Sequence, residues 1–287
     1  MSSPTPSNAG GSDTAAKPLP VKPSFTHLKE KLGPLVKTIQ FSWFTGHVFV
    51  ILSAVLYSLS TFRLFFTSEK FAGIIYRFAY LAIIFTFGII IKQTYQNKKI
   101  TPLAILHDDN IHYLLIAFLW LFSARSFSTL LPFIIFSTFH ALTYVRSHIL
   151  PALGYPATSP LSTKINLFIK AQNDRAMQFA ASSELATLAS LFVSVISFNK
   201  AAWVKFAIYL IFVRVRFEHS AFTKAALKTW EVKIDQLVAH PKAPVFLKSA
   251  WTNYKNFVRV YIGNGLSPER IFPSRQPTGA SGARKAQ

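Results

Sequence analysis

The side chains best suited to chemistry stand together near the middle of the chain, at His107, Asp108, Asp109 and His112. Imidazole and carboxylate groups at this spacing could hold a metal ion or transfer a proton. However, the two aspartates and Asn110 directly precede an apolar stretch, where such residues cap a helix and favour its positive N-terminal end. The sequence therefore predicts a helix cap at this position.

Motifs with a defined catalytic mechanism are absent from the sequence. It contains no G-x-x-x-x-G-K-[ST] phosphate loop, no G-x-S-x-G nucleophile elbow and no H-E-x-x-H zinc motif. It also contains no cysteine, which excludes disulfides, thiol catalysis and cysteine metal sites. His140 lies in an apolar stretch, where a hydrogen bond to a neighbouring helix is expected. We therefore predict that the protein is not an enzyme and uses no metal and no cofactor.

The clearest local pattern lies near the C-terminus, in residues 245–262. At about 100° per residue, apolar and polar side chains separate onto two faces of a helix. We predict that this helix binds the membrane surface, with apolar contacts from Leu247, Trp251, Tyr254, Phe257, Val258 and Tyr261 and electrostatic contacts from Lys248, Lys255 and Arg259. The alternative is a helix that packs against the protein's own membrane domain.

The composition indicates which environment these elements occupy. Of the 287 residues, 51% are hydrophobic and only 15% are charged, against about 25% charged in a typical soluble domain. Lysine and arginine number 31 and acidic residues 11, a net charge of +20. Soluble nucleic-acid binders are basic but polar, whereas here the mean hydropathy is +0.32. The sequence therefore favours an integral membrane protein beside anionic lipid, with no direct nucleic-acid partner.

Three apolar regions predict helical hairpins in the bilayer. Residues 41–91 hold two stretches long enough to span, and Arg77 in the second can reach the headgroups from near its end. Residues 111–145 and 184–217 are each too long for one span and too short for two full spans. We expect each to form a short hairpin whose tip reaches the far interface or stops within the bilayer.

The predicted fold class is an all-α integral membrane protein, with helical hairpins in the bilayer, C-terminal amphipathic helices and disordered tails. The remaining segments are a disordered leader at 1–23, a juxtamembrane amphipathic helix at 24–40, a cytosolic loop at 92–110, a cytosolic segment at 146–183, basic amphipathic helices at 218–262 and a disordered tail at 263–287. If every apolar region is a hairpin, 25 of the 31 basic residues lie on one side. That side is expected to be cytosolic, together with both termini.

Four stretches resemble the transmembrane protein 33 family, in particular its fungal branch of nuclear pore-membrane proteins (nucleoporins). They are Ile105–Leu115, Leu131–Tyr144, Tyr209–Phe217 and Pro241–Phe246. The resemblance covers about residues 35–262 in matching order, and none of the motifs is catalytic. One departure is His107-Asp108, where the family pattern leads us to expect Glu-Asp.

The resemblance implies a multi-pass protein of the endoplasmic reticulum membrane and nuclear envelope, located at nuclear pores. It also implies reticulon-type membrane-shaping partners, nuclear pore components, a transport receptor and a membrane-binding C-terminal region. The leading hypothesis is therefore a protein that shapes or stabilises curved membrane and contributes to nuclear pore assembly or distribution. The alternative is a membrane scaffold or regulator without curvature activity. A lipid-modifying enzyme or transporter is a third hypothesis, for which Arg125 and Lys205 are weak candidate residues.

Overall fold

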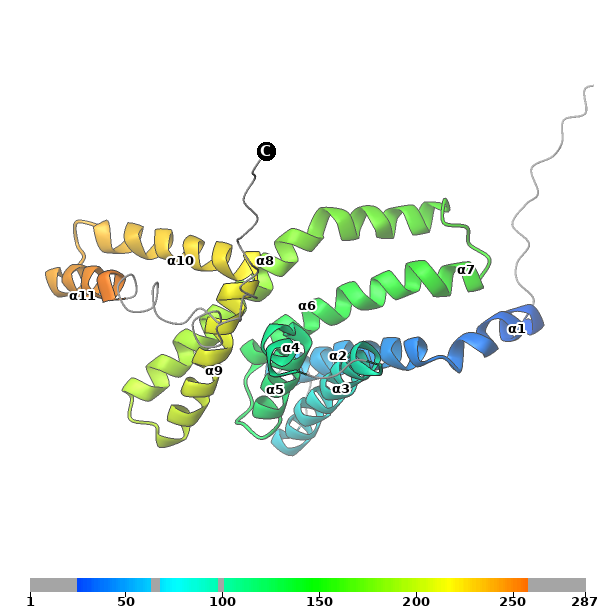
Figure 1. Cartoon of the computed structure of the whole chain (residues 1–287), viewed down its shortest axis with the longest axis horizontal. Helices are drawn as coiled ribbons and strands as arrows, with labels where there is room; N and C mark the ends of the chain where they lie inside the picture. The colour runs from blue at the N-terminus through cyan, green and yellow to red at the C-terminus, as the bar shows by residue number, and fades with distance from the viewer. Residues whose placement is uncertain (1–24, 63–67, 98–100, 258–287) are drawn as a thin grey trace, which may run out of the picture.

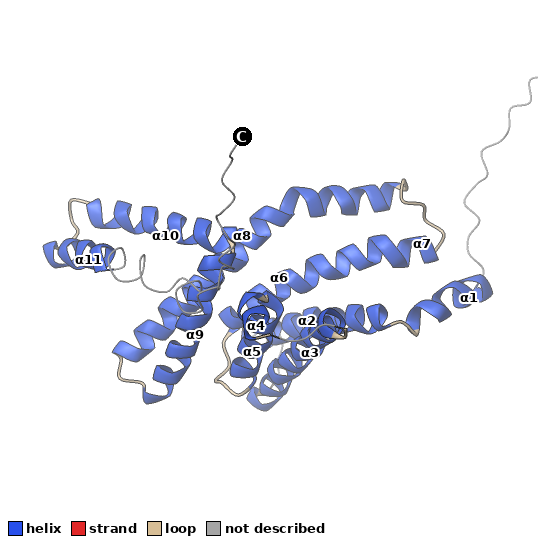
Figure 2. Ribbon diagram, viewed as in Figure 1, coloured by secondary structure: helices blue, strands red, loops and turns tan. Residues whose placement is uncertain are grey.

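The computed structural model describes residues 25–62, 68–97 and 101–257. Within these ranges the regular structure is helical and contains no strand (Figure 2). Along the chain (Figure 1) the elements are α1 Phe25–Val36, α2 Ile39–Thr61, α3 Glu69–Tyr95, α4 Pro102–His107, α5 Asp109–Leu121, α6 Phe127–Tyr144, a π-helical turn Val145–Ile149, α7 Leu150–Ala152, α8 Pro160–Ile196, α9 Lys200–His219, α10 Ala221–Ala239 and α11 Val245–Phe257. The all-α fold class is confirmed, whereas the segments predicted to be disordered, 1–23 and 263–287, lie outside the described residues.

Polar residues ahead of apolar stretches set where helices begin. The Thr38 hydroxyl accepts a hydrogen bond from the backbone N–H of Phe41 at 3.1 Å, ahead of α2. The Asp108 carboxylate accepts one from the N–H of Asn110 at 2.8 Å, ahead of α5. Each bond satisfies an amide that has no partner within its helix. The predicted helix cap at Asp108 is confirmed.

Four of the described helices are long and apolar enough to cross a membrane: α2, α3, the continuous helix Phe127–Ala152, and α8. In contrast, α5 has 13 residues, about 20 Å at 1.5 Å per residue, which is short of a ~30 Å hydrocarbon core. With 20 residues α9 is long enough, but it is too charged and too polar to count as a span. In each of the two later hairpins, one helix could cross the membrane (Phe127–Ala152 or α8) and the other (α5 or α9) lacks the length or the composition to do so. The sequence had predicted two short arms for each hairpin.

The predicted boundaries of these two hairpins differ from the helix ends. The first extends beyond residue 145, because the helix continues through a π-helical turn to Ala152. The second begins earlier, because α8 starts at Pro160 and passes Glu184 without a break. Lys, Arg and Gln form helices as readily as Leu does, so a helix does not stop where hydropathy changes. Hydropathy locates the apolar part of α8 but not its start.

A close approach between α2 and α3 depends on a glycine. A Cβ atom at Gly46 would lie 2.5 Å from Thr86 Cγ2 and 3.2 Å from a ring carbon of Phe85. Thr86 is almost fully buried, and its hydroxyl is bonded to the carbonyl of Ile83 at 2.8 Å, so its methyl group has little room to move. Gly46 therefore sets the spacing of the first hairpin.

We expect Gly46→Ala to destabilise the purified protein by about 1–3 kcal/mol, the usual cost of an overpacked contact. Gly88→Ala is the matched control, because a Cβ there would meet no atom within 4 Å. The control should be neutral or stabilising, since alanine favours a helix over glycine by about 1 kcal/mol. Thermal unfolding in one detergent measures both changes. Equal midpoints for the two variants would contradict the packing role of Gly46.

The turn between α5 and α6 is attached to α3 by basic side chains. Arg125 donates to the backbone carbonyl of Glu69 at 2.7 Å and to its carboxylate at 2.5 Å. Arg77 donates to the carbonyl oxygen of Leu121, at the end of α5. Arg77 therefore makes its contact within the protein, whereas the sequence predicted that it could reach the lipid headgroups. Arg125 forms its ion pair at a partly exposed hairpin end, not in the interior expected of a transport site.

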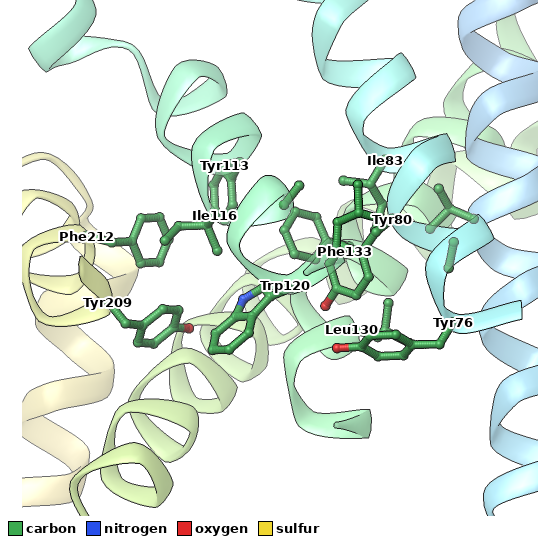
Figure 3. Close-up of a cluster of buried hydrophobic side chains, with 14 of the residues drawn as sticks. Tyr76, Tyr80, Ile83, Tyr113, Ile116, Trp120, Leu130, Phe133, Tyr209 and Phe212 are labelled. Carbon is green, nitrogen blue, oxygen red and sulfur yellow. The ribbon is translucent and has the colours of Figure 1, made fainter. Parts of the chain in front are cut away.

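The core lies where α3, α5, α6 and α9 meet, and it is largely aromatic. Figure 3 shows its main side chains, which are Tyr76, Tyr80, Ile83, Tyr113, Ile116, Trp120, Leu130, Phe133, Tyr209 and Phe212. The hydroxyls of Tyr76 and Tyr80 lie 3.0 and 2.8 Å from the hydroxyl of Thr129, which itself donates to the carbonyl of Ser126. These bonds satisfy polar atoms that would otherwise be costly to bury.

Candidate membrane-binding surface

The last two described helices fold back on each other beside the end of α9 (Figure 1). A single residue, Ser220, separates α9 from α10 and caps α10 by accepting from the N–H of Thr223 at 3.2 Å. The first turns of α10 pack against α8, where Thr223 and Ala226 are fully buried. After the turn at 240–244, α11 runs back along α10. The start of the pair is therefore anchored on the membrane domain.

One acidic residue fastens α11 to α10. The indole N–H of Trp251 donates to Asp235 Oδ1 at 2.6 Å, and the ammonium group of Lys255 donates to the same oxygen at 2.7 Å. Lys255 also lies 5.7 Å from the centre of the Trp251 ring, within the range of a cation–π contact. Trp251 stacks on Tyr254 with ring centres 5.4 Å apart. We call Asp235, Trp251 and Lys255 the Asp235 latch.

The charge of Asp235 is favoured in this setting. The hydrogen bond from Lys255, followed by that from Trp251, holds the pKa of the Asp235 carboxyl below its usual value. A lowered folded-state pKa means that the carboxylate stabilises the pair at every pH above about 4, the ordinary aspartate value. That contribution is lost only as the pH falls through the lowered pKa. Between pH 5 and 8 the Asp235 latch should therefore stay closed.

We expect Asp235→Ala to loosen α11 while leaving the start of α10 in place. Hydrogen exchange of the full chain in detergent at pH 7 should become faster for the amides of 245–257 and remain unchanged near Ala226. Glu231→Ala is the matched control, because Glu231 pairs with Lys228 on its own helix at 3.2 Å. If both variants exchange at the wild-type rate in α11, the Asp235 latch does not hold the helix.

Large apolar side chains of α11 are left uncovered. Val245, Phe246, Leu247 and Tyr254 are 80%, 68%, 44% and 55% exposed. At about 100° per residue, the last three fall on one side of the helix, next to the edge that carries Trp251. Uncovered apolar faces of this kind mark interaction sites. Beside lysines, such a face combines the two contacts that an anionic membrane surface offers.

The structure describes the side chains of five of the nine predicted membrane-binding residues. Leu247 and Tyr254 are exposed, as membrane contact requires. Lys248 is half-buried. Trp251 and Lys255 instead meet Asp235 of α10, so this edge of the stripe packs on the neighbouring C-terminal helix, whereas the alternative placed it against the membrane domain. Phe257 ends α11 and its side chain is not among those described; Val258, Arg259 and Tyr261 lie beyond the described residues.

Sequence reasoning missed Asp235. It stands on a different helix from Trp251, and the pairing appears only once the turn at 240–244 brings the two helices together. The one available signal was an acidic residue inside a strongly basic segment, 218–262. Such a residue is also common on a solvated helix face, so the signal by itself does not predict a latch.

The central histidines do not gather into a metal site. His112 Nδ1 lies 3.9 Å from Asp109 Oδ1, while the ring of His107 packs against that of His219 with centres 4.5 Å apart. Across 25–62, 68–97 and 101–257, no group of three or more His, Cys, Asp or Glu side chains could hold a metal ion.

The two histidines between α2 and α6 have different roles. His47 Nδ1 lies 3.0 Å from the hydroxyl of Ser137, which forms a hydrogen bond between the two helices. The ring of His140 packs against His47 and Trp43, with centres 4.9 and 5.0 Å apart. The interhelical bond expected from His140 is thus supplied by His47.

The helical fold and its four candidate spans define an all-α integral membrane protein, here with an uncovered apolar and basic helix beside its membrane domain. The sequence model of the family Transmembrane protein 33/Nucleoporin POM33 matches residues 22–262. The chain belongs to this family, which confirms the resemblance carried by the four sequence stretches.

Three relatives align with most of the chain. Nucleoporin POM33 of Chaetomium thermophilum is 33% identical over 257 residues, which cover 82% of this chain and 89% of the relative. The Pore membrane protein of 33 kDa of Saccharomyces cerevisiae is 33% identical over 248 residues, covering 79% and 85%. Tetra-spanning protein 1 of Schizosaccharomyces pombe is 34% identical over 272 residues, covering 88% and 94%. No solved structure matches the chain.

Proposed function

We propose that this chain is a non-enzymatic membrane protein of the endoplasmic reticulum and nuclear envelope that shapes or stabilises curved membrane. We further propose that it contributes to the assembly or distribution of nuclear pore complexes. The observation that carries the shaping role is the exposed apolar face of α11, which the Asp235 latch holds against α10. The pore role is supported by relatives at 33% identity that are named a nucleoporin and a pore membrane protein.

The shaping mechanism is an unequal occupation of the two leaflets. With both termini cytosolic, α10 and α11 lie at the cytosolic leaflet, and α11 inserts its exposed face shallowly there. Burying a Phe or Leu side chain contributes about 1.5–3 kcal/mol, and each lysine near an anionic surface about 1 kcal/mol. The short helix α5 adds volume to the same leaflet if it does not reach the other one. Both effects favour a membrane that bulges toward the cytosol.

Reconstitution of the purified full chain into anionic liposomes tests this function. A shaping protein should tubulate the liposomes, or concentrate in the smallest vesicles, without any partner present. Vesicles with an unchanged shape and an even distribution of the chain would favour the second candidate.

That second candidate is a scaffold or regulator that binds reticulon-type or other reticulum proteins and has no curvature activity of its own. It is favoured by the Trp251 edge of α11, which already packs on protein. Leu237 of α10 is 71% exposed and could extend such a protein contact. Nuclear pore components and a transport receptor are the further partners that the family resemblance suggested.

A further inference from the structure

A cluster of polar side chains joins three helices of the membrane domain, where α5 begins and α9 ends. Arg216 of α9 donates from Nη1 to Asp109 Oδ2 of α5 at 2.6 Å, and its Nε lies 3.9 Å from Glu184 Oε2 of α8. The hydroxyl of Tyr113, also on α5, donates to Glu184 Oε1 at 2.5 Å. The guanidinium group of Arg216 lies 5.1 Å from the centre of the Tyr113 ring. Each of these contacts therefore joins two different helices. Asp109 and Tyr113 are both on α5, and no contact between them is involved.

Burial makes these contacts consequential. Glu184 is 1% exposed and Arg216 7% exposed. A charge removed from water is tolerated when it is paired, and it is strongly unfavourable when its partner is withdrawn. If α9 shifted away from α5 and α8, the buried guanidinium of Arg216 would lose both carboxylates, and the buried carboxylate of Glu184 would keep only the hydroxyl of Tyr113. The cluster thus favours one arrangement of the three helices over others that would pack equally well by shape.

The cluster stands directly before the membrane-binding helices. The backbone N–H of Ser220 donates to the carbonyl of Arg216 at 2.8 Å, so Arg216 belongs to the last turn that leads into α10. Because only Ser220 connects the two helices, the direction of α10 follows from where α9 ends. The contacts of Thr223 and Ala226 with the membrane domain are likewise made only if α9 ends at this position.

We propose that Asp109, Tyr113, Glu184 and Arg216 form a clamp that sets the orientation of α10 and α11 relative to the membrane helices. Arg216 is the positioning residue, because it alone joins the carboxylates of α5 and α8 to α9. That this orientation serves to present α11 to the cytosolic leaflet rests on the proposed function. The orientation itself does not depend on that function, and it can be measured whether or not α11 binds lipid.

The absence of cysteine makes the measurement direct. Lys92→Cys on α3 and Lys233→Cys on α10, both at exposed positions, would carry spin labels on the full chain in nanodiscs of neutral lipid. The otherwise unchanged chain should give one narrow distance between the labels. Arg216→Met should lose that single distance in favour of a broad distribution. Arg216→Lys should recover part of it, because an ammonium group keeps the charge but cannot bridge two carboxylates as the guanidinium does.

Two controls separate the clamp from general damage. Glu218→Gln removes a nearby charge whose ion pair with Arg214, at 2.5 Å, lies within α9, so the narrow distance should remain. A second label pair, Lys92→Cys with Thr143→Cys on α6, reports the membrane helices alone and should stay narrow in every variant. If it broadens in Arg216→Met, that variant has not folded, and Glu184→Gln and Asp109→Asn then decide the question.

Each outcome bears on the proposal. Broadening that is confined to the α3–α10 distance and to the cluster variants supports the clamp, whether or not α11 binds liposomes. A narrow wild-type distance in Arg216→Met would overturn it. Equal broadening in Glu218→Gln would overturn it as well, because the effect would then belong to the end of α9 in general. If the cluster variants with milder changes keep the single distance while Arg216→Met is unfolded, the cluster supports folding only and the proposal fails.

Discussion

A peptide of residues 245–262 that carries Phe246→Asp and Leu247→Asp is expected to lose its affinity for anionic liposomes by roughly a hundredfold or more. Both side chains are exposed on α11, at 68% and 44%. Losing the burial of a Phe and a Leu in lipid removes about 3–6 kcal/mol, and every 1.4 kcal/mol is a factor of ten. The native peptide should be mostly unfolded in water and become helical on the liposomes, which circular dichroism measures along with binding.

The matched control places the same two negative charges on the polar face, as Thr252→Asp with Asn256→Asp. Electrostatic repulsion from anionic lipid is then equal in the two variants, and only the apolar face differs. We expect the control to retain most of its affinity and to weaken chiefly at low salt, where charges are least screened. Trp251 is left intact because it belongs to the Asp235 latch. Similar binding by the two variants would mean that the exposed face meets protein, and the scaffold function would gain support.

In the full chain, the same two aspartates are expected to abolish enrichment at curved pore membrane while the protein stays in the reticulum. The hairpins still anchor the chain, because four of its described helices have the length and composition of spans. On the proposed function, what is lost is the shallow insertion of α11, which would contribute to curvature preference but not to retention. The ratio of the tagged protein's signal at nuclear pores to its signal in the surrounding reticulum measures this loss.

The Thr252→Asp and Asn256→Asp chain again serves as the control and should keep the wild-type ratio. A uniform fall of both variants from the membrane would point to misfolding. An unchanged ratio for the Phe246 and Leu247 variant would place the pore-directing contact elsewhere, with the hairpins or with a protein partner.

Local patterns predicted those parts of the structure that local forces determine. Asp108 caps α5 because a short acidic side chain stands one residue ahead of the helix, which can be seen in the sequence. The common side on which Leu247 and Tyr254 lie follows from helical spacing within α11. The apolar stretches located the first hairpin and the apolar half of α8. Each of these features depends on neighbours a few residues apart.

Contacts between distant residues could not be predicted in this way. Asp109 and Arg216 are 107 positions apart, and their ion pair exists only after α5 and α9 pack together. The same holds for Tyr113 and Glu184, which are 71 positions apart. Asp109 stands in the first turn of α5, where an acidic residue is expected, so nothing in its neighbourhood indicated that it also pairs with Arg216. The partner of Trp251 was missed for the same reason: helical spacing identifies a face but not what covers it.

The unbroken course of α8 limits how the family can vary in length. Its contacts with α6 lie on both sides of its midpoint: the ring of Phe168 stacks on Phe139 with centres 6.3 Å apart, and the hydroxyl of Thr187 lies 3.4 Å from that of Ser128. One residue inserted between these contacts would rotate one half of the helix by about 100° against the other, and one of the two would point away from α6. The turn at 240–244 could absorb the same insertion without a change of phase. Insertions and deletions should therefore be tolerated between α10 and α11 and selected against within α8.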